Sequence, residues 1–527
     1  MRRFLNKGIA LLLIICTMGA LLAGCSGKDT PAGKLIYYYL ETEPKNLDPQ
    51  VSKDYASRIV IQSLFEGLAR LDESGTPVPG VAERWEASAD QRQYTFYLRE
   101  TAKWSDESKL TAQDFLFGIQ RALDPATGSD ICEVLFCIEN AEAIRKGEAE
   151  MSSLGVQVVG SREIRFTLNE SMPEFPALTA EPVFLPCKEE FFTECAGRYG
   201  LEPDTVLGNG PFMLRKRYGW VHKEYLHLVK NGTYHAPEEI LPAGVKLKIA
   251  RFPEDAVADL LNVDVFLDAS PLRLEQLEEA RVKGLTVTAF EDTTWGLRIN
   301  PAAMPFTSLS MRQAVMQSLS FDVAMETVLD NTEPIQGILP EGMTLGNRPY
   351  RERVGQVRRL YSSPEVTHDL MRQGLKELGR SSMPEITILC ADSLDAKKVA
   401  NNLLTQWKKG VGEYFRIVTL SQEEIQKRVT AGNYQLAIVK LENNGTDPAE
   451  YLSQLLLAET EWELSRREDE RITQIYQMEN DLIAQGIFYP LFGEKHYFAM
   501  APNVSGIRFS PFQGGIDFRQ AGKLDDD

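Results

Sequence analysis

Apolar and polar residues alternate along several short segments of the chain. Residues 94–99 and residues 164–168 both follow a period of two. Because successive side chains of a strand point to opposite faces, this pattern predicts half-buried strands. Apolar residues with a helical period follow Thr111-Ala-Gln-Asp114 and Ser421-Gln-Glu-Glu424, in which a hydroxyl and an acidic residue are three positions apart. This spacing is typical of a capped helix N-terminus.

Two longer periodic segments predict further helices. Residues 311–329 and residues 471–483 repeat apolar positions with a helical period. The segments that follow the N-terminal region contain no apolar run long enough to span a membrane. Such a mixture of strands and helices predicts an α/β or α+β protein of two or three domains.

The N-terminal segment is cationic and then apolar. Three cations within the first seven residues precede an uncharged run over residues 9–23, which has about the length of a secretory signal core. The run ends in Leu22-Ala-Gly-Cys25, which closely resembles the bacterial lipobox, so we expect residues 1–24 to be a signal peptide and Cys25 to be lipidated. Two or more acyl chains, at about 0.8 kcal/mol per buried methylene, would anchor the chain outside the cytoplasmic membrane through the polar tether 25–33. The alternative is an uncleaved helix with an incidental cysteine.

The composition is that of a globular protein with an acidic surface. The 527 residues are 43% hydrophobic and 25% charged, with a formal net charge of -18 at pH 7. Without the three cations of the leader the charge is about -21. Such a surface repels phosphate backbones, so we expect no nucleic-acid partner.

Five cysteines follow the lipobox: Cys132, Cys137, Cys187, Cys195 and Cys390. Disulfides are permitted outside the cytoplasm. The first two cysteines and the next two are close enough in sequence to pair, but spacing alone does not establish the geometry of a disulfide. Cys390 ends an apolar run, which favours a buried structural thiol.

No catalytic, metal or cofactor motif is found in the sequence. The five histidines are His222, His227, His235, His368 and His496, and none belongs to a metal or nucleophile motif. A serine nucleophile elbow, a phosphate-binding loop and paired-cysteine zinc spacing are also missing. Scattered carboxylates remain compatible with a hydrolase, since acid and base pairs need no local motif. We therefore expect no catalytic residue, no metal and no cofactor.

Several segments occur in the order and at the spacing of one protein family. They include Glu43-Pro-Lys-Asn-Leu-Asp-Pro49, Leu64-Phe-Glu-Gly-Leu68, Trp104-Ser-Asp106, Leu110-Thr-Ala-Gln-Asp-Phe115 and Gly208-Asn-Gly-Pro-Phe212. Together they resemble the oligopeptide/dipeptide-binding family of extracytoplasmic solute-binding proteins that serve ABC importers. The resemblance extends from about residue 34 to about residue 519. Most of these residues are expected to pack cores or form turns, so they identify the fold and not the ligand.

The resemblance implies an α/β fold, namely a bilobal clamp of the type II periplasmic-binding-protein class with an additional third domain. The expected boundaries are residues 34–64, 189–292 and 500–522 for lobe I, residues 65–188 for the additional domain, and residues 293–499 for lobe II. Hinge closure would enclose an extended peptide whose backbone groups pair in a strand-like manner. The implied protein is a monomer that hands a peptide or peptide-like solute to an ABC permease.

The resemblance also implies ligand contacts, counted without gaps from the nearest family motifs. They are Lys53, Tyr55, Leu267, Asp268, Trp295, Lys440, Leu441, Glu442, Asn443, Asn444 and Asp447. Lys53 stands where relatives carry an acidic residue, and Leu441 stands where they carry a tryptophan. Leu267 and Asp268 replace an aromatic residue and an asparagine. Trp295 either stacks on the ligand or packs in the core.

One substitution bears directly on the ligand. Asn444 takes the place of an aspartate that in relatives holds the α-ammonium group of the peptide. A neutral amide loses that charge-assisted hydrogen bond, which is worth about 1.5–3 kcal/mol to a buried cation. Glu442, Asp447 and Asp268 are candidates for the missing anion. Asn443-Asn444-Gly445 is alternatively a simple turn, because Asn and Gly tolerate positive φ.

The expected function is capture of a peptide-like solute for an importer, without covalent chemistry. The altered site favours a peptide with a modified or absent free amino terminus, or another solute such as a sugar or a metal chelate. Two other functions remain open at this point. They are a lipid-anchored receptor for a signalling peptide and a lipid-anchored hydrolase.

Overall fold

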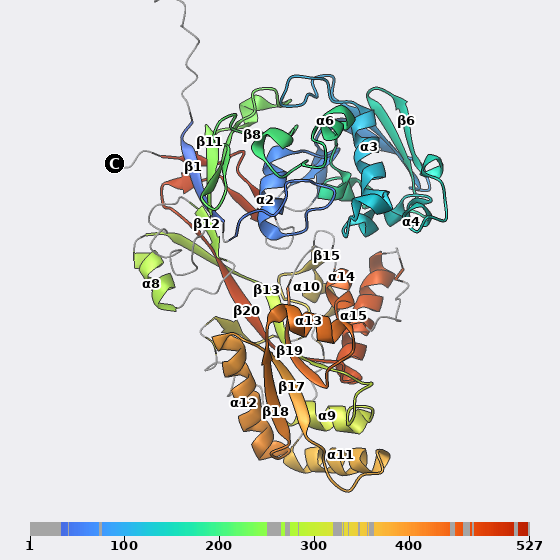
Figure 1. The fold of residues 1–527 in the computed structure, drawn as a ribbon, viewed down its shortest axis with the longest axis vertical. Helices are drawn as coiled ribbons and strands as arrows, with labels where there is room; N and C mark the ends of the chain where they lie inside the picture. The colour runs from blue at the N-terminus through green and yellow to red at the C-terminus, as the bar shows by residue number, and fades with distance from the viewer. Residues whose placement is uncertain are drawn as a thin grey trace, which may run out of the picture.

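The computed structural model describes residues 33–524 with internal gaps. The gaps are residues 41, 73–75, 250–264, 269–273, 283, 320–328, 330, 336, 346–347, 356, 358–362, 443–447, 457–463, 466–467 and 511–514. The expected signal peptide, Cys25 and the tether up to residue 32 lie outside the described residues. The described chain forms an upper and a lower lobe (Figure 1). No helix in its described part is long and apolar enough to cross a membrane.

One twelve-stranded sheet runs through both lobes. Its main path is β18-β17-β19-β13-β20-β12-β1-β11-β10-β8. The long strands β13 (Thr286–Ile299) and β20 (Phe488–Met500) pair antiparallel along almost their whole length. They extend from the upper lobe into the lower one (Figure 1), so this strand pair is the structural connection on which the lobes would turn.

The upper lobe contains β1 (Leu35–Leu40), β8 (Phe212–Leu214), β9 (Trp220–Val221), β10 (Tyr225–Lys230), β11 (Gly244–Ile249) and β12 (Val265–Asp268). In β1, Ile36, Tyr38 and Leu40 point into the core, as the period of two requires. Helix α2 (Tyr55–Leu64) packs against the same core. The short pair β22 (Arg508–Ser510) and β23 (Gly515–Asp517) brings the C-terminal part of the chain beside α2.

A separate four-stranded sheet lies at the far side of the upper lobe (Figure 1). Its order is β4 (Ala82–Ala87), β5 (Gln93–Leu98), β7 (Glu163–Thr167) and β6 (Val156–Gly160). The strands predicted at residues 94–99 and 164–168 are β5 and β7, so both predictions are confirmed. Helix α3 (Ala112–Leu123) begins after Thr111, whose backbone N–H donates to the Asp114 carboxylate at 2.7 Å, as the capping sequence predicts. This sheet shares one continuous hydrophobic core with the strands of the upper lobe.

The lower lobe is built on the parallel strands β17 (Ile386–Ala391), β18 (Phe415–Leu420) and β19 (Leu436–Leu441). Helices α12 (Leu394–Gly410) and α13 (Gln422–Thr430) cover opposite faces, because Ile388 packs with the α12 cluster and Leu389 with the α13 cluster. Trp407 is fully buried and its indole N–H donates to the Val315 carbonyl at 2.9 Å. Helices α9 (Leu309–Gln317), α10 (Tyr350–Val354), α11 (Pro364–Glu377), α14 (Pro448–Ser453) and α15 (Glu468–Ala484) complete the lobe.

The helix predictions for this lobe are largely confirmed. Ser421 caps α13 by accepting a hydrogen bond from the Glu424 backbone N–H at 3.2 Å. The segment 471–483 lies within α15. The segment 311–329 is helical only in its first part, since α9 ends at Gln317, and residues 320–328 lie outside the described chain.

The five cysteines after the lipobox are buried, free thiols. Cys390 is fully buried in β17, which confirms the structural thiol predicted there. The Cys132 thiol donates to the Ser129 carbonyl and the Cys137 thiol to the Val134 carbonyl, and the two cysteines do not form a disulfide with one another. Burial raises the pKa of Cys187 to about 12, so this thiol remains protonated at neutral pH.

Candidate functional site

A group of polar residues lies where β13 and β20 pass between the lobes. We call Asp292, Lys440, Glu442, Glu494 and His496 the hinge cluster. Asp292 occupies a β-bulge of β13, between the pairs Glu291–Lys495 and Thr293–Glu494. A bulge bends the strand and redirects the extra side chain, and bulges are enriched next to functional sites. The end of β19 supplies Lys440 and Glu442, because Trp295 of β13 pairs with Lys440.

Glu494 is the buried centre of this cluster, with 1% of its surface exposed. Its carboxylate accepts from the Trp295 indole N–H at 2.6 Å and from the Asn331 amide at 3.4 Å, and it pairs with the Lys440 ammonium at 2.9 Å. Burial acts to raise the pKa of Glu494, but Lys440 and the other partners outweigh burial and lower it. Glu494 is therefore an anion whose charge the protein itself compensates.

Asp292 and Glu442 are in the opposite situation. Burial raises the pKa of Asp292, with a further rise from Glu494, although His496 lies 3.8 Å away and Thr293 donates to it at 3.0 Å. Glu442 is exposed, yet the surrounding protein removes enough water to raise the pKa of its carboxyl group. The charge of Lys440 lowers this pKa, and the charge of Asp292 raises it. Among the described residues, no hydrogen bond reaches the Glu442 carboxylate. These two carboxylates would gain from an additional cation.

The upper lobe brings one predicted ligand contact to this cluster. Tyr55 begins α2, is 37% exposed and has its pKa raised by burial and then by the carboxylate of Asp292. The phenol and the hinge cluster therefore face a common space. Lys53 lies two residues earlier and is exposed, with its ammonium 2.7 Å from the carboxylate of Asp130. The structure thus ties Lys53 to the upper lobe.

Two other predicted contacts in the upper lobe are placed only by their backbones. Leu267 and Asp268 lie in β12 and pair with Phe498 and Tyr497 of β20. This register puts the end of β12 beside the same strand that carries Glu494 and His496. The side chains of Leu267 and Asp268 lie outside the described part of the structure.

The predicted contacts in the lower lobe differ in how much surface they present. Trp295 is 3% exposed and stacks on Phe492, with 5.5 Å between the ring centroids, so it packs in the core of the lobe. Leu441 is also 3% exposed and packs in a core, while its carbonyl accepts from the Tyr451 hydroxyl at 2.6 Å. Lys440 is half-buried, and its ammonium lies 4.6 Å from the Trp295 ring centroid. Asn443, Asn444 and Asp447 lie outside the described residues.

Three residues of the hinge cluster are absent from the sequence-based prediction. They are Asp292, Glu494 and His496. A signal for two of them is present in the sequence, because Glu494, Lys495 and His496 interrupt the mostly apolar strand 488–500, and Glu494 and His496 share one face of it. Charged residues are rarely buried unless they are paired, so this interruption marks a place of special chemistry.

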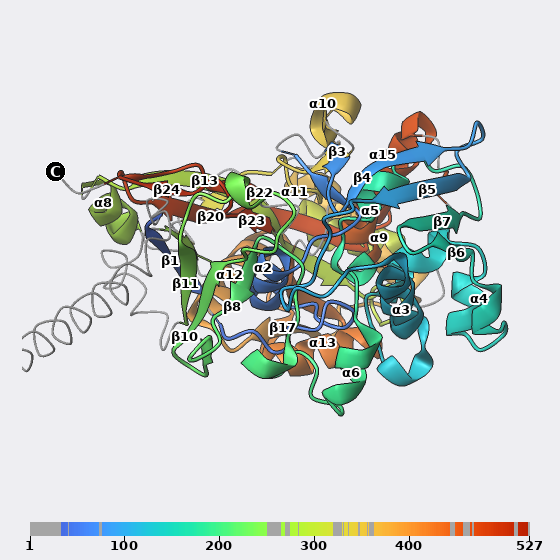
Figure 2. The same ribbon diagram turned by 90° about the horizontal axis from the view of Figure 1, so that it is seen from above.

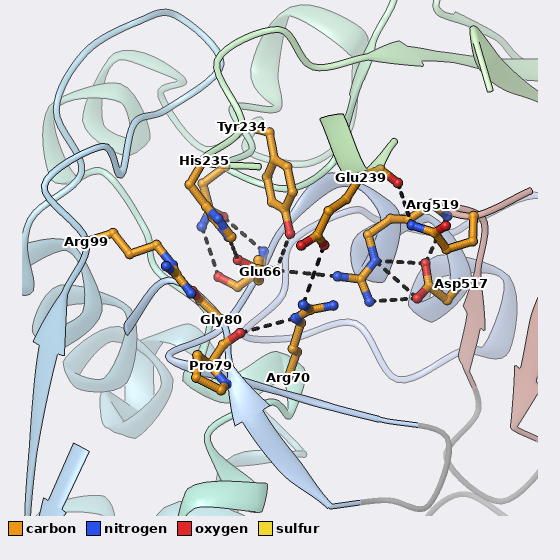
Figure 3. A network of polar contacts seen from close by, with 12 residues as sticks. Glu66, Arg70, Pro79, Gly80, Arg99, Tyr234, His235, Glu239, Asp517 and Arg519 are labelled. Carbon is orange, nitrogen blue, oxygen red and sulfur yellow. Dashed lines mark hydrogen bonds and ion pairs between the residues drawn. The ribbon is translucent and has the colours of Figure 1, made fainter. Parts of the chain in front are cut away.

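A second polar network lies in the upper lobe between α2 and the β22–β23 pair (Figure 3). Glu66 accepts hydrogen bonds from the Tyr234 hydroxyl and contacts the His235 ring, and the Arg519 guanidinium lies 3.9 Å away. Arg519 also pairs with Asp517 at 2.6 Å. Burial opposes the charged forms, but the pair lowers the pKa of Asp517 and raises that of Arg519.

The same network continues to the adjacent strand β2 (Ala69–Leu71). Arg70 donates to the Pro79 carbonyl at 3.1 Å and lies 3.5 Å from the Glu239 carboxylate. A pocket of about 530 Å³ adjoins these residues and is also lined by Phe65 and Phe212. Each charged member of the network has a protein partner, so the network fastens the C-terminal strands to the lobe.

Comparison with known proteins agrees with this architecture. The model of the bacterial extracellular solute-binding proteins, family 5 (middle part), matches residues 76–461. The dipeptide-binding protein of Bacillus subtilis (strain 168) is 24% identical over 549 aligned positions, which cover 99% of both chains. A probable deoxycholate-binding periplasmic protein of Escherichia coli (strain K12) is 26% identical over 477 residues, which are 85% of this chain and 83% of the relative.

A solved structure gives the same result for the fold. The substrate-binding domain of an oligopeptide ABC transporter from Bacillus anthracis (strain Ames) superimposes with a TM-score of 0.73 at 25% identity, covering 94% of this chain and 99% of that one. The predicted α/β fold, a type II bilobal clamp with more than two domains, is thereby confirmed. The resemblance drawn from the sequence motifs is confirmed as well. The chain belongs to family 5 of the bacterial extracellular solute-binding proteins.

Proposed function

We propose that this protein is an extracytoplasmic lipoprotein that captures peptides between its lobes and delivers them to an ABC permease. The lipobox sequence at Cys25 supports the anchor, and the relatives named for dipeptides and oligopeptides support the ligand class. The observation that carries the proposal is the hinge cluster, in which the pKa values of Asp292 and Glu442 are raised although His496 and Lys440 lie nearby. The ligand leaves chemically unchanged, because binding energy and lobe closure suffice for capture and release.

The two lobes take different roles in this proposal. Residues 34–64, 189–292 and 500–522 form lobe I, residues 65–188 form the additional domain, and residues 293–499 form lobe II. Strands β13 and β20 cross between the lobes and act as the hinge. Small dihedral changes in such strands are enough to close a clamp around a ligand.

The hinge cluster would hold the α-ammonium group of the peptide. Asp292 and Glu442 supply the negative charge that Asn444 does not, and both have raised pKa values that a bound cation would lower. Tyr55 and Lys440 border the same space from the two lobes. The peptide backbone would pair with exposed strand edges, which tolerates varied side chains.

Isothermal titration calorimetry tests the ligand class. The protein, unfolded and refolded to remove any co-purified ligand, is titrated with a pool of short peptides and with the same pool after N-acetylation. Saturable heat with the free-amine pool and weaker binding of the acetylated pool are expected. No heat with either pool would remove the peptide proposal, and cleavage products in a mass spectrum of the mixture would remove the claim that the ligand is unchanged.

Detergent phase partitioning tests the anchor independently. The chain expressed with its leader should enter the detergent phase, whereas a Cys25→Ser variant should remain in the aqueous phase. Equal partitioning of the two chains would show that Cys25 carries no lipid. Peptide binding by the unanchored variant should match that of the wild type.

A further inference from the structure

An exposed cationic surface lies on an otherwise acidic protein. In β10 and β11 the residues Leu226, Leu228, Val245 and Leu247 are fully buried. Because side chains alternate along a strand, Tyr225, His227, Lys246 and Lys248 face the other side of the sheet, where they are partly exposed. The loop that follows β8 adds Arg215, Lys216, Arg217 and Tyr218, all exposed. We call these eight residues the basic face.

The loop is fixed to the sheet by backbone hydrogen bonds. The Arg215 N–H donates to the His227 carbonyl at 3.0 Å, and the His227 N–H donates to the Gly219 carbonyl at 2.7 Å. These bonds hold the three consecutive cations of the loop next to the cations of β11. Tyr218 is 73% exposed at the tip, with a positive φ of 58°. The basic face is thus one surface and not two separate charged segments.

The cations of the basic face experience one another's charge. Burial lowers the pKa of His227, and the neighbouring Arg215 and Lys246 lower it further. Among the residues that the structure describes, Arg215, Lys216, Arg217, Lys246 and Lys248 form no ion pair. The carboxylates of Glu43 and Glu202, which lie nearby, are already in contact with His222 at 2.7 Å and 3.3 Å.

Aromatic rings accompany these cations. The Lys246 ammonium lies 3.9 Å from the centroid of the Tyr225 ring, and Lys523 lies 5.9 Å from that of Tyr37 on the neighbouring strand β1. Tyrosine is enriched at the interface between water and lipid, where one end of the side chain is apolar and the other is wet. Cations beside tyrosines match an anionic phospholipid surface.

The expected anchor lies close to this surface in the chain. Strand β1 begins at Leu35 and pairs with β11 from Gly244 onward, so the first described strand after the anchor segment lies beside a strand of the basic face. The segment 25–33, which joins the expected anchor to β1, can span at most about 30 Å. Lys248 lies about 13 Å from Gly244 along β11, so the basic face is within the reach of a membrane that holds the anchor. Figures 1 and 2 both place β1 and β11 at the side of the upper lobe away from the four-stranded sheet, and Figure 2 shows β10 beside them.

We propose that the basic face docks the protein on the anionic phospholipid surface of the membrane that carries its lipid anchor. The inference rests on the anchor of the proposed function, but not on the identity of the ligand. The net charge, which is -18 for the whole chain and about -21 without the three cations of the leader, does not prevent such docking, because charges farther away than the screening length of about 8 Å are largely screened at physiological salt. Docking would fix the orientation of the lobes relative to the membrane and so to the permease.

Vesicle cosedimentation tests the docking without the anchor. The chain from Ser26 onward retains every described element, and it is mixed with vesicles of phosphatidylcholine alone or of phosphatidylcholine and phosphatidylglycerol in equal parts. Binding to the anionic vesicles at 50 mM NaCl is expected, with a loss of about tenfold in the partition coefficient at 300 mM NaCl. Equal binding to both vesicle types would overturn the proposal, as would equally tight binding to soluble polyphosphate.

A matched pair of variants locates the binding surface. The double variant Lys216→Glu and Arg217→Glu should reduce the partition coefficient on anionic vesicles at least about fivefold. The control is Lys376→Glu and Arg380→Glu at the end of the lower-lobe helix α11, where both cations are exposed. An equal loss in the control would overturn the proposal. Both variants should bind peptides as the wild type does, so failure of the docking and failure of peptide binding are distinguishable.

Discussion

Two polar networks of this protein contain similar residues but differ in charge balance. In the Glu66 network, three carboxylates contact two guanidinium groups and a histidine, and Arg519 is shared between Glu66 and Asp517. In the hinge cluster Glu494 pairs with Lys440 at 2.9 Å, whereas Asp292 has only the more distant His496, at 3.8 Å. The pKa of Asp517 is lowered, whereas that of Asp292 is raised. The negative charges of the Glu66 network are balanced by the protein's own cations, whereas those of the hinge cluster would be balanced only with an additional positive charge.

The difference follows from where the two networks lie. The Glu66 network joins segments within one lobe, so folding alone brings all of its partners together. The hinge cluster lies between lobes that would move relative to one another, and a buried carboxylate there whose charge is only partly compensated costs free energy until a ligand arrives. Such a cost is common at binding sites, where stability is lower than the fold could provide. The predictions below test this contrast, beginning with the largest effect.

The largest effect is expected from Arg519→Met, which removes the shared cation and keeps a long side chain. Breaking a buried ion pair by removing one partner typically costs about 3–5 kcal/mol, because Asp517 and Glu66 would remain buried without it. Urea denaturation followed by circular dichroism measures the loss. The exposed Lys216→Met variant is the control and should change stability by less than about 0.5 kcal/mol. An unchanged unfolding midpoint for Arg519→Met would contradict the structural role of the network.

The second effect is on affinity. Asp292→Asn should weaken binding of a free-amine peptide by about 1.5–3 kcal/mol, which is roughly 10- to 150-fold in Kd, because a charge-assisted hydrogen bond is lost. Calorimetry with one peptide and its N-acetylated form measures the change. The acetylated peptide should bind both proteins equally, and Asp130→Asn should leave both affinities unaltered. A loss of the same size for the acetylated peptide would show that Asp292 does not contact the ammonium group.

A smaller change in affinity is expected from Glu442→Gln. Solvent reaches Glu442 and screens its charge, so its contribution should remain below about 1 kcal/mol, or roughly fivefold in Kd. The effect should also decrease at high salt, unlike that of Asp292→Asn. Calorimetry at two salt concentrations separates the two carboxylates. If Glu442→Gln weakened peptide binding equally at both salt concentrations, Glu442 and not Asp292 would be the residue that contacts the ammonium group of the ligand.

The sequence predicts the local structure better than the site. The strands β5 and β7 and the starts of α3 and α13 follow from periodicity and from capping residues a few positions apart. These features depend on neighbours in the chain, so a sequence displays them directly. The helix predicted to begin at residue 311 and to continue to residue 329 extends past the observed end of α9 at Gln317, because the apolar spacing continues beyond that point.

The hinge cluster depends on contacts that no local pattern contains. Trp295 and Glu494 are almost two hundred residues apart, and they meet only because β13 and β20 pair. The bulge at Asp292 arises from a register shift between those strands and has no sequence signature of its own. Family resemblance led to Tyr55, Lys440 and Glu442, since their positions could be counted from motifs. The charged interruption of β20 was the available signal for Glu494.

The last prediction concerns the free energy that the partly compensated Asp292 carboxylate costs the folded protein in the absence of ligand. The folded-state pKa of Asp292 is raised above the ordinary value of about 3.9, so the folded protein binds more protons than the unfolded chain between those two values. The contribution of the Asp292 carboxyl group to the free energy of unfolding is therefore intact at low pH and is lost as pH rises through the folded pKa. Asp292→Asn removes this penalty and should raise the Tm of the ligand-free protein at neutral pH by about 1–2 °C.

The gain should disappear in acid, which distinguishes it from better packing. Below the unfolded pKa both states carry a protonated Asp292, so the two proteins should melt at the same temperature. The amide oxygen of the variant can still accept the hydrogen bond that Thr293 donates to Asp292. A Tm difference that persists at every pH would mean that charge is not its cause. A variant less stable at neutral pH would show that Asp292 is already compensated, and the contrast between the two networks would be lost.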